Sequence, residues 1–178
     1  MKAYGLAAAL VMTLGAIAAP ARAASATDAF AGYSALAGGD SGTLHGWQAA
    51  LGWGGSGHFG LVLDVSGHLG SASESGDDVS TLALMAGPRL RFGSGRLRPF
   101  VHVIGGVVRA KAGVRVFDVE ISESTTDFGG AAGGGFDLGF GERWALRLAA
   151  DYRVLKVDVG TARDPRFSAG VDYRFGAR

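Results

Sequence analysis

Arg166-Phe-Ser-Ala-Gly-Val-Asp-Tyr-Arg-Phe175 is the stretch that decides the fold, because it alternates apolar and polar residues without a break. Successive side chains of a β-strand point to opposite sides of the sheet. One face of this segment is therefore apolar and carries Phe167, Ala169, Val171, Tyr173 and Phe175. The other face is polar and carries Ser168, Gly170, Asp172 and Arg174. The pattern predicts a strand with one apolar wall and one wall that bears charge.

The spacing within this strand resembles the C-terminal signal of bacterial outer-membrane β-barrels. In that signal a polar residue is followed by a glycine and then by two aromatic residues at fixed intervals. The matching positions are Ser168, Gly170, Tyr173 and Phe175, with three further residues, 176–178, after the last aromatic. The resemblance implies that the barrel-assembly machinery recognises this strand during biogenesis.

The N-terminus reads as an export segment. Lys2 supplies a positive charge, residues 6–19 form a short apolar run, and Ala21-Arg-Ala23 is a small-residue cleavage pattern. The run is shorter than the roughly 20 residues that a transmembrane helix needs. We therefore predict a cleaved signal peptide over residues 1–23, with Ala24 as the alternative cleavage position, and a barrel domain over residues 24–178.

The composition agrees with an exported β-protein. The chain has 178 residues, 31 of them glycine, and no cysteine, which excludes thiol catalysis and cysteine metal cages. Without residues 1–23 the chain carries 15 basic and 16 acidic side chains, so no strongly basic surface suggests a nucleic-acid partner.

Eight alternating segments follow the export segment. We predict strands over residues 28–37, 44–53, 58–69, 79–92, 98–111, 126–140, 143–157 and 166–175. Short glycine-rich turns alternate with longer polar connections over 38–43, 70–78, 112–125 and 158–165. An even strand number with alternating short turns and long loops is typical of transmembrane barrels. The predicted fold is all-β: an eight-stranded antiparallel up-and-down transmembrane β-barrel.

The fifth segment is the exception to the alternation. Residues 99–108 are apolar on both faces, and a β-bulge at Gly105-Gly106 would allow the strand to change face.

Aromatic residues recur at the strand ends that meet a short turn or a chain terminus. These are Phe30, Trp53, Phe59, Phe92, Phe100, Phe140, Trp144 and Phe175. Aromatic rings favour the headgroup level of a bilayer. We therefore predict an aromatic girdle at the periplasmic rim, with both chain ends in the periplasm.

Charged residues gather on the opposite face of the strands. The predicted lumen network comprises Asp64, Arg89, Arg91, Asp137, Arg147, Asp151, Arg153, Asp172 and Arg174. Eight strands leave an interior that side chains fill, and unpaired buried charges are costly. A filled lumen of paired charges is thus expected, with a narrow small-solute channel as the alternative if the ion pairs exchange partners.

Three other kinds of site compete with this network as an interpretation. Asp64, Ser66 and His68 share a face and could form a relay of the kind that a lipid A-modifying membrane enzyme needs. They are predicted to point into the barrel and not at lipid, so a lumen network is favoured and no catalytic residue is assigned. Neither His45, His58, His68 and His102 nor the glycines at 129–135 form a recognisable metal or phosphate motif. No cofactor or metal is expected.

The third long connection carries both acidic and β-branched residues. Asp118, Glu120, Glu123 and Asp127 could hold a cation, but such a run is usually solvated. The apolar residues of this stretch favour instead a hairpin that continues the barrel strands beyond the membrane; they are Val114, Val116, Phe117, Val119 and Ile121. Loop 112–125 is accordingly the candidate contact for a surface partner.

As a whole, residues 27–176 resemble the eight-stranded OmpA/OmpX-like outer-membrane barrel family. The resemblance implies a monomeric protein of the cell outer membrane that contacts outer-membrane lipid. Most such proteins are not enzymes, and we expect a structural or surface-interaction role.

Overall fold

The computed structural model describes residues 27–38, 42–54, 58–71, 78–93, 95–116, 119–157 and 160–175. The signal peptide expected over residues 1–23 and the tail 176–178 lie outside this described part of the chain. No helix that is long and apolar enough to cross a membrane occurs among the described residues.

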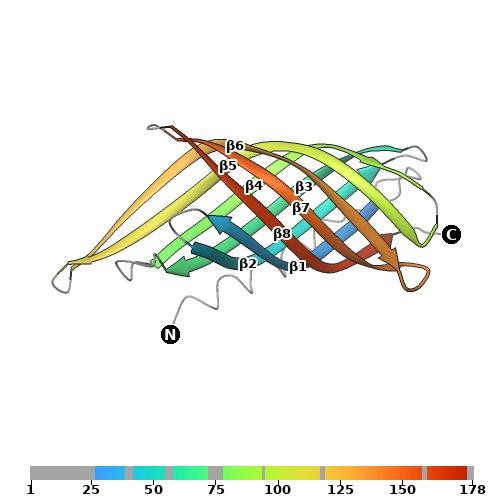
Figure 1. Ribbon diagram of the computed structural model, residues 1–178, viewed down its shortest axis with the longest axis horizontal. Helices are drawn as coiled ribbons and strands as arrows, with labels where there is room; N and C mark the ends of the chain where they lie inside the picture. The colour runs from blue at the N-terminus through green and yellow to red at the C-terminus, as the bar shows by residue number, and fades with distance from the viewer. Residues whose placement is uncertain are drawn as a thin grey trace.

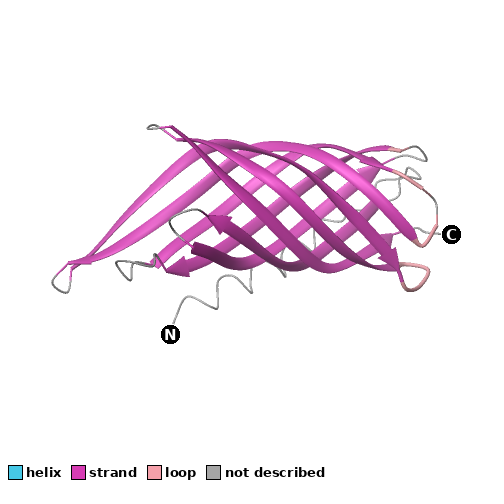
Figure 2. Cartoon of the chain, in the orientation of Figure 1, coloured by secondary structure: helices cyan, strands magenta, loops and turns pink. Residues whose placement is uncertain are grey.

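Eight strands close into one antiparallel barrel in simple chain order, and β1 pairs with β8 to complete it (Figure 1). All the regular secondary structure drawn for the described residues is strand (Figure 2). The predicted fold class is confirmed. The strands are β1 (Thr27–Gly38), β2 (Gly42–Gly54), β3 (Phe59–Ser71), β4 (Asp78–Arg91), β5 (Leu97–Val116), β6 (Val119–Gly139), β7 (Trp144–Val157) and β8 (Gly160–Phe175).

The four expected long connections are all shorter than the sequence suggested, most of all the last two. β8 begins at Gly160, and its pairing with β7 runs to Val157↔Gly160, so most of 158–165 is strand. Pairing with β7 overrides the local turn signal of Asp164-Pro165, since strand propensity depends strongly on tertiary context. β5 and β6 likewise stay paired to Val116↔Val119, which confirms the projecting hairpin (Figure 1).

β5 keeps one phase from Leu97 to Lys111. Phe100, His102 and Ile104 face inward and are buried, while Val101 and Val103 face outward. The register with β6 is continuous through Gly105-Gly106, so the bulge that the sequence allowed does not form. The ladder with β4 is interrupted only around Gly87-Pro88, where proline lacks an N–H to donate.

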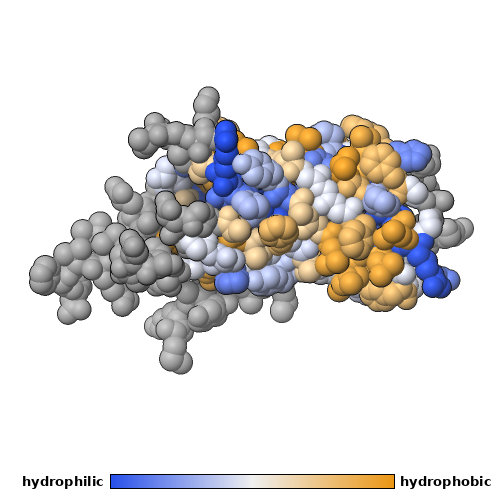
Figure 3. All heavy atoms as spheres, viewed as in Figure 1, coloured by the Kyte–Doolittle hydropathy of each residue, from blue (hydrophilic) through white to orange (hydrophobic). Residues whose placement is uncertain are grey.

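The outer wall of the barrel is apolar. Leu61, Val103, Leu146 and Val171 are all exposed on it, and hydrophobic residues gather on the visible face toward the end with the short turns (Figure 3). Burial of such a wall requires lipid, because a monomer in water rarely exposes a large apolar patch.

Two glycines keep space inside the barrel for charged side chains. A Cβ at Gly52 would collide with the Arg89 guanidinium and with the Asp28 carboxylate, and a Cβ at Gly133 would collide with Asp151. The glycine-rich run in β6 thus includes a position that only a residue without a Cβ can fill.

The charged interior of the barrel as candidate functional site

The lumen holds two groups of ion pairs. The first, called the turn-side cluster, lies near the short turns and the chain termini. Its centre is Arg147 of β7, whose guanidinium contacts three carboxylates: Asp137 at 2.7 Å, Asp172 at 2.8 Å and Asp28 at 3.2 Å. Asp28 of β1 also accepts a 2.6 Å hydrogen bond from Arg89 of β4 on the opposite wall. All five side chains are at most 5% exposed.

Arginines complete the turn-side cluster toward the mouth of the barrel. Arg91 also pairs with Asp28 and keeps 25% of its side chain exposed. Arg174 lies 3.9 Å from Asp172. Arg98 is partly buried on the inward face of β5. Its cross-strand neighbour in the backbone register is Asp137 of β6. The cluster therefore ends in three arginines at the mouth, on β4, β5 and β8.

The second group, the loop-side cluster, lies farther along the lumen and is organised by Arg166. This arginine of β8 is fully buried and reaches Asp64 of β3 at 2.9 Å, Asp151 of β7 at 2.9 Å and Ser66 at 3.1 Å. His102 of β5 lies 2.8 Å from Asp151. Arg166 and Asp64 are 102 residues apart in the sequence. Their strands, β8 and β3, stand three places apart around the closed barrel, so the pair crosses the lumen.

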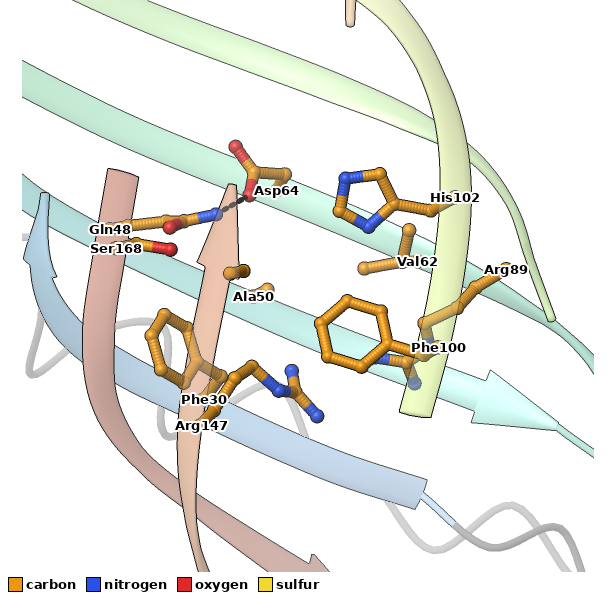
Figure 4. A pocket seen from close by; sticks show the side chains of 11 residues that line it. Phe30, Gln48, Ala50, Val62, Asp64, Arg89, Phe100, His102, Arg147 and Ser168 are labelled. Atoms are coloured by element: carbon orange, nitrogen blue, oxygen red, sulfur yellow. Dashed lines mark hydrogen bonds between the residues drawn. The ribbon is translucent and has the colours of Figure 1, made fainter. Parts of the chain in front are cut away.

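An apolar layer separates the two clusters. The rings of Phe30 and Phe100 lie on either side of the Arg147 guanidinium, 5.2 Å and 4.9 Å from its central carbon (Figure 4). These distances are within the range of cation–π contacts. A small cavity borders this layer, is lined by residues of both clusters, and has room for about one water molecule.

The nine charged residues that the sequence assigned to the lumen all lie on the inward faces, but they do not form one network. Arg89, Arg91, Asp137, Arg147, Asp172 and Arg174 belong to the turn-side cluster, and Asp64 and Asp151 to the loop-side cluster. Arg153 is 1% exposed, yet its Nε and Nη1 atoms have no hydrogen-bond acceptor within the described residues.

Two residues that organise these clusters were missed by the sequence reasoning. Asp28 and Arg166 stand at the ends of their predicted strands, where a residue is easily read as part of a turn. Arg166 lies an even number of residues from Ser168 and Asp172, and Asp28 lies an even number from Ser34, so each shares a strand face with buried polar residues. Strict application of the period of two would have placed both inside.

The catalytic relay that was considered at Asp64, Ser66 and His68 does not form. His68 Nε2 lies 2.9 Å from the Ser34 hydroxyl, whereas Ser66 accepts from Arg166. Asp64 is engaged by Arg166 and by the Gln48 amide. All three side chains are buried inside the barrel, away from the lipid-facing wall.

Six of the eight aromatic residues expected in the girdle are exposed on the outer wall. They are Trp53, Phe59, Phe92, Phe140, Trp144 and Phe175, each at least 42% exposed. The assignment is wrong for Phe30 and Phe100, which are 3% exposed and point into the lumen. Phe30 lies two residues from the buried Asp28, and Phe100 two residues from the buried His102, so the strand period of two places both rings inside.

A second group of exposed aromatics, which the sequence reasoning did not identify, lies toward the loop end. It comprises Tyr33, Phe128, Tyr152 and Phe167. Eight residues separate Trp144 from Tyr152 along β7, about 26 Å of strand. A tilt of roughly 40° reduces this to about 20 Å along the barrel axis, close to the ~25 Å apolar band of outer-membrane barrels.

The residues of the proposed assembly signal lie together on β8. Tyr173 packs edge-on against Trp144 and Phe175, with ring centroids 4.7 Å and 4.9 Å away. Its hydroxyl accepts a 3.2 Å hydrogen bond from Arg143, which raises the pKa of that arginine. Ser168 is buried and Gly170 faces inward on the same strand. The apolar part of the signal therefore also ties β8 to β7 at the rim.

No group of three His, Asp or Glu side chains converges as metal ligands in the part of the chain that the structure describes. Asp118, one member of the acidic run considered for a cation, lies outside the described residues.

The comparisons with known proteins agree with this architecture. Residues 6–175 match the family model of the outer membrane protein beta-barrel domain. No curated protein matches the chain in sequence.

Several solved outer-membrane proteins share the fold at low sequence identity. Neisserial surface protein A is 16% identical with a TM-score of 0.62, and the alignment covers 86% of this chain and 98% of that one. Ail, the attachment invasion locus protein of Yersinia pestis, solved with the heparin analogue sucrose octasulfate, is 18% identical with a TM-score of 0.63, over 85% of this chain and 99% of that one. OprG from Pseudomonas aeruginosa is 12% identical with a TM-score of 0.60, over 86% and 97% of the two chains.

The closed eight-stranded barrel, its apolar outer wall and the match over nearly the whole chain lead to one conclusion: this protein belongs to the outer membrane protein beta-barrel domain family and resides in the outer membrane.

Proposed function

We propose that this protein is a non-enzymatic, closed outer-membrane barrel with a structural or surface-interaction role. The observation that carries the proposal is the pair of cross-lumen clusters. Arg166 links β8 to Asp64 of β3, and Asp28 of β1 binds Arg89 of β4, so strands three places apart around the barrel are joined across the lumen at two heights. The apolar layer between them leaves space for about one water.

The support for a closed lumen is both steric and energetic. An interior enclosed by eight strands is only wide enough for side chains. Breaking a buried ion pair by removal of one partner costs about 3–5 kcal/mol, so these pairs resist the opening of a permanent pore. A narrow gated channel is the second candidate, because Asp28 has three arginine partners between which it could exchange.

Single-channel recording on the refolded full chain tests this proposal. We expect no steady conductance above that of the empty bilayer. Reproducible conductance that disappears in Arg147→Gln or Asp151→Asn would favour the channel. A gel-mobility shift between unboiled and boiled samples serves as the control that each variant is folded.

The surface role is assigned to the β5–β6 hairpin around loop 112–125. β6 pairs with β7 only from Gly129 onward, so the part of β6 from Val119 to Phe128 extends past that ladder. An unpaired strand edge offers N–H and C=O groups to a partner. Replacement of 112–125 by a two-residue turn should keep the folded, heat-modifiable barrel while removing binding of cells that express it to matrix-coated surfaces. Equal binding by the shortened protein would refute this assignment.

Recognition of β8 by the barrel-assembly machinery is part of the same proposal. Ser168, Gly170, Tyr173 and Phe175 match the spacing of the family's terminal signal. Phe175→Ala should lower the amount of protein in the outer-membrane fraction, whereas Phe128→Ala, an exposed aromatic outside β8, should not.

A further inference from the structure

The charges at the mouth of the turn-side cluster are unbalanced. Five guanidinium groups, those of Arg89, Arg91, Arg98, Arg147 and Arg174, face the lumen at this end. Three carboxylates, those of Asp28, Asp137 and Asp172, face them within the described residues. The mouth therefore carries an excess of two positive charges.

Arg89 and Arg147, the two buried arginines of the turn-side cluster, contact most of the carboxylate oxygens. Arg147 contacts all three aspartates, and Arg89 takes Asp28 at 2.6 Å. The excess charge consequently belongs to the three outer arginines. Arg91 shares Asp28 with two other arginines, and Arg174 is 3.9 Å from Asp172. No aspartate or glutamate lies within ion-pair distance of Arg98 among the residues described.

The outer arginines also keep buried donors without acceptors. Arg98 Nε and Arg174 Nη2 are shielded from solvent but have no hydrogen-bond partner within the described part of the chain. A buried donor that lacks an acceptor is destabilising, and more so when the group is charged. An acceptor from outside the protein would remove this cost.

A glycine leaves a space between these two arginines. A Cβ placed on Gly139 would lie 3.6 Å from Arg98 Nη2 and 3.9 Å from Arg174 Nη2. The two guanidinium groups therefore reach the same point of the mouth, next to the turn between β6 and β7. Arg91 stands at the same end on β4, with a quarter of its side chain exposed.

We propose that Arg91, Arg98 and Arg174 form a binding site for a phosphate-class oxyanion at the periplasmic mouth of the barrel. Guanidinium forks match the oxygens of phosphate with paired hydrogen bonds. Three guanidinium groups, from β4, β5 and β8, suit a tetrahedral anion because it presents oxygen atoms in several directions. A carboxylate presents only two oxygen atoms, in one plane. The site lies outside the closed part of the lumen, so it does not depend on whether the barrel conducts.

The experiment uses the full chain refolded in an uncharged, phosphate-free detergent. Inorganic phosphate is titrated while the arginine Nε–H signals are followed by ¹⁵N NMR, with chloride at matched ionic strength as the screening control. We expect saturable shifts of the Arg98 and Arg174 signals with phosphate only. The Arg98→Gln substitution should lower the affinity for phosphate at least tenfold. Arg96 is an exposed arginine in the turn between β4 and β5, and the Arg96→Gln variant should bind phosphate as the wild type does.

Gly139→Ala provides a variant that retains every charge. The added Cβ makes ordinary van der Waals contact with both guanidinium groups, so the barrel should fold while phosphate binding weakens. A second arm uses vesicles with and without phosphatidylglycerol. Shifts in detergent with free phosphate identify a soluble anion as the ligand, and shifts only in phosphatidylglycerol vesicles identify a lipid headgroup. Equal responses to phosphate and chloride in every arm, or a wild-type response in Arg98→Gln, would overturn the proposal.

Discussion

Removal of the Arg147 guanidinium should destabilise the barrel strongly. This group touches three buried carboxylates, at 2.7 Å, 2.8 Å and 3.2 Å. Asp28 would retain Arg89 and Arg91, but Asp137 has no other ion-pair partner within the described residues. Loss of one partner from a buried pair costs about 3–5 kcal/mol. Arg147→Met, which retains much of the side-chain volume between the two phenylalanine rings, should therefore lower the free energy of unfolding by about that amount.

The assay is urea unfolding of the protein refolded into lipid vesicles, followed by tryptophan fluorescence. The transition midpoint should fall while the slope with urea stays unchanged, since the surface exposed on unfolding is the same. Asp137→Asn in the same background tests the coupling directly: the double variant should be less destabilised than the sum of the single variants, by about 0.5–3 kcal/mol. The matched control is Arg96→Met, an exposed arginine at the same end of the barrel.

One result would refute the reasoning. If Arg147→Met unfolds at the wild-type midpoint with the wild-type slope, the turn-side cluster contributes nothing net to stability. The closed lumen would then have to be explained by side-chain packing alone.

The remaining predictions concern single positions. Gly52→Val places side-chain atoms where the Arg89 guanidinium lies; it should reduce the yield of the heat-modifiable folded band on gels, and a normal yield would contradict the close packing described for this site. Tyr173→Ala removes ring contacts to Trp144 and Phe175, each worth about 0.5–1.5 kcal/mol, and should lower the urea midpoint accordingly, whereas an unchanged midpoint would mean that the rim cluster is not stabilising. Phe30→Ala should cost about 3–5 kcal/mol and enlarge the cavity between the two clusters; if the closed-lumen argument is correct it should raise conductance above that of the wild type, with Phe30→Leu as the control that refills most of the volume.

Local alternation was a sound guide to which face of a strand a side chain occupies. Trp144, Leu146 and Leu148 lie on the outer wall and Arg147 lies inside, as the sequence predicted. The wrong assignments are those that rest on the position of a residue along its strand instead of on the side-chain period of two. Phe30 and Phe100 were assigned to the lipid-facing rim because they stand near strand ends, and Arg166 was omitted because it stands at the start of a strand.

The lengths of the strands were harder to predict than their faces. Asp164-Pro165 signals a turn, but the structure continues β8 back to Gly160. A local signal reports only the conformational preference of the segment itself. The pairing that overrides it comes from β7, and its register depends on closure of the whole barrel.

The sequence by itself determined the class of fold and the two-sided character of the strands, because the side-chain period of two is a property of the chain alone. The tertiary structure decided which charges meet. Arg166 and Asp64 are 102 residues apart and lie on non-adjacent strands, so their contact depends on how far each strand is shifted against its neighbours around the barrel. The same closure divides the inward charges into two clusters, places Phe30 and Phe100 between them, and leaves an excess of positive charge on the three outer arginines at the mouth. Parity is a local property, whereas the height of a residue in a barrel is fixed only when the last strand pairs with the first.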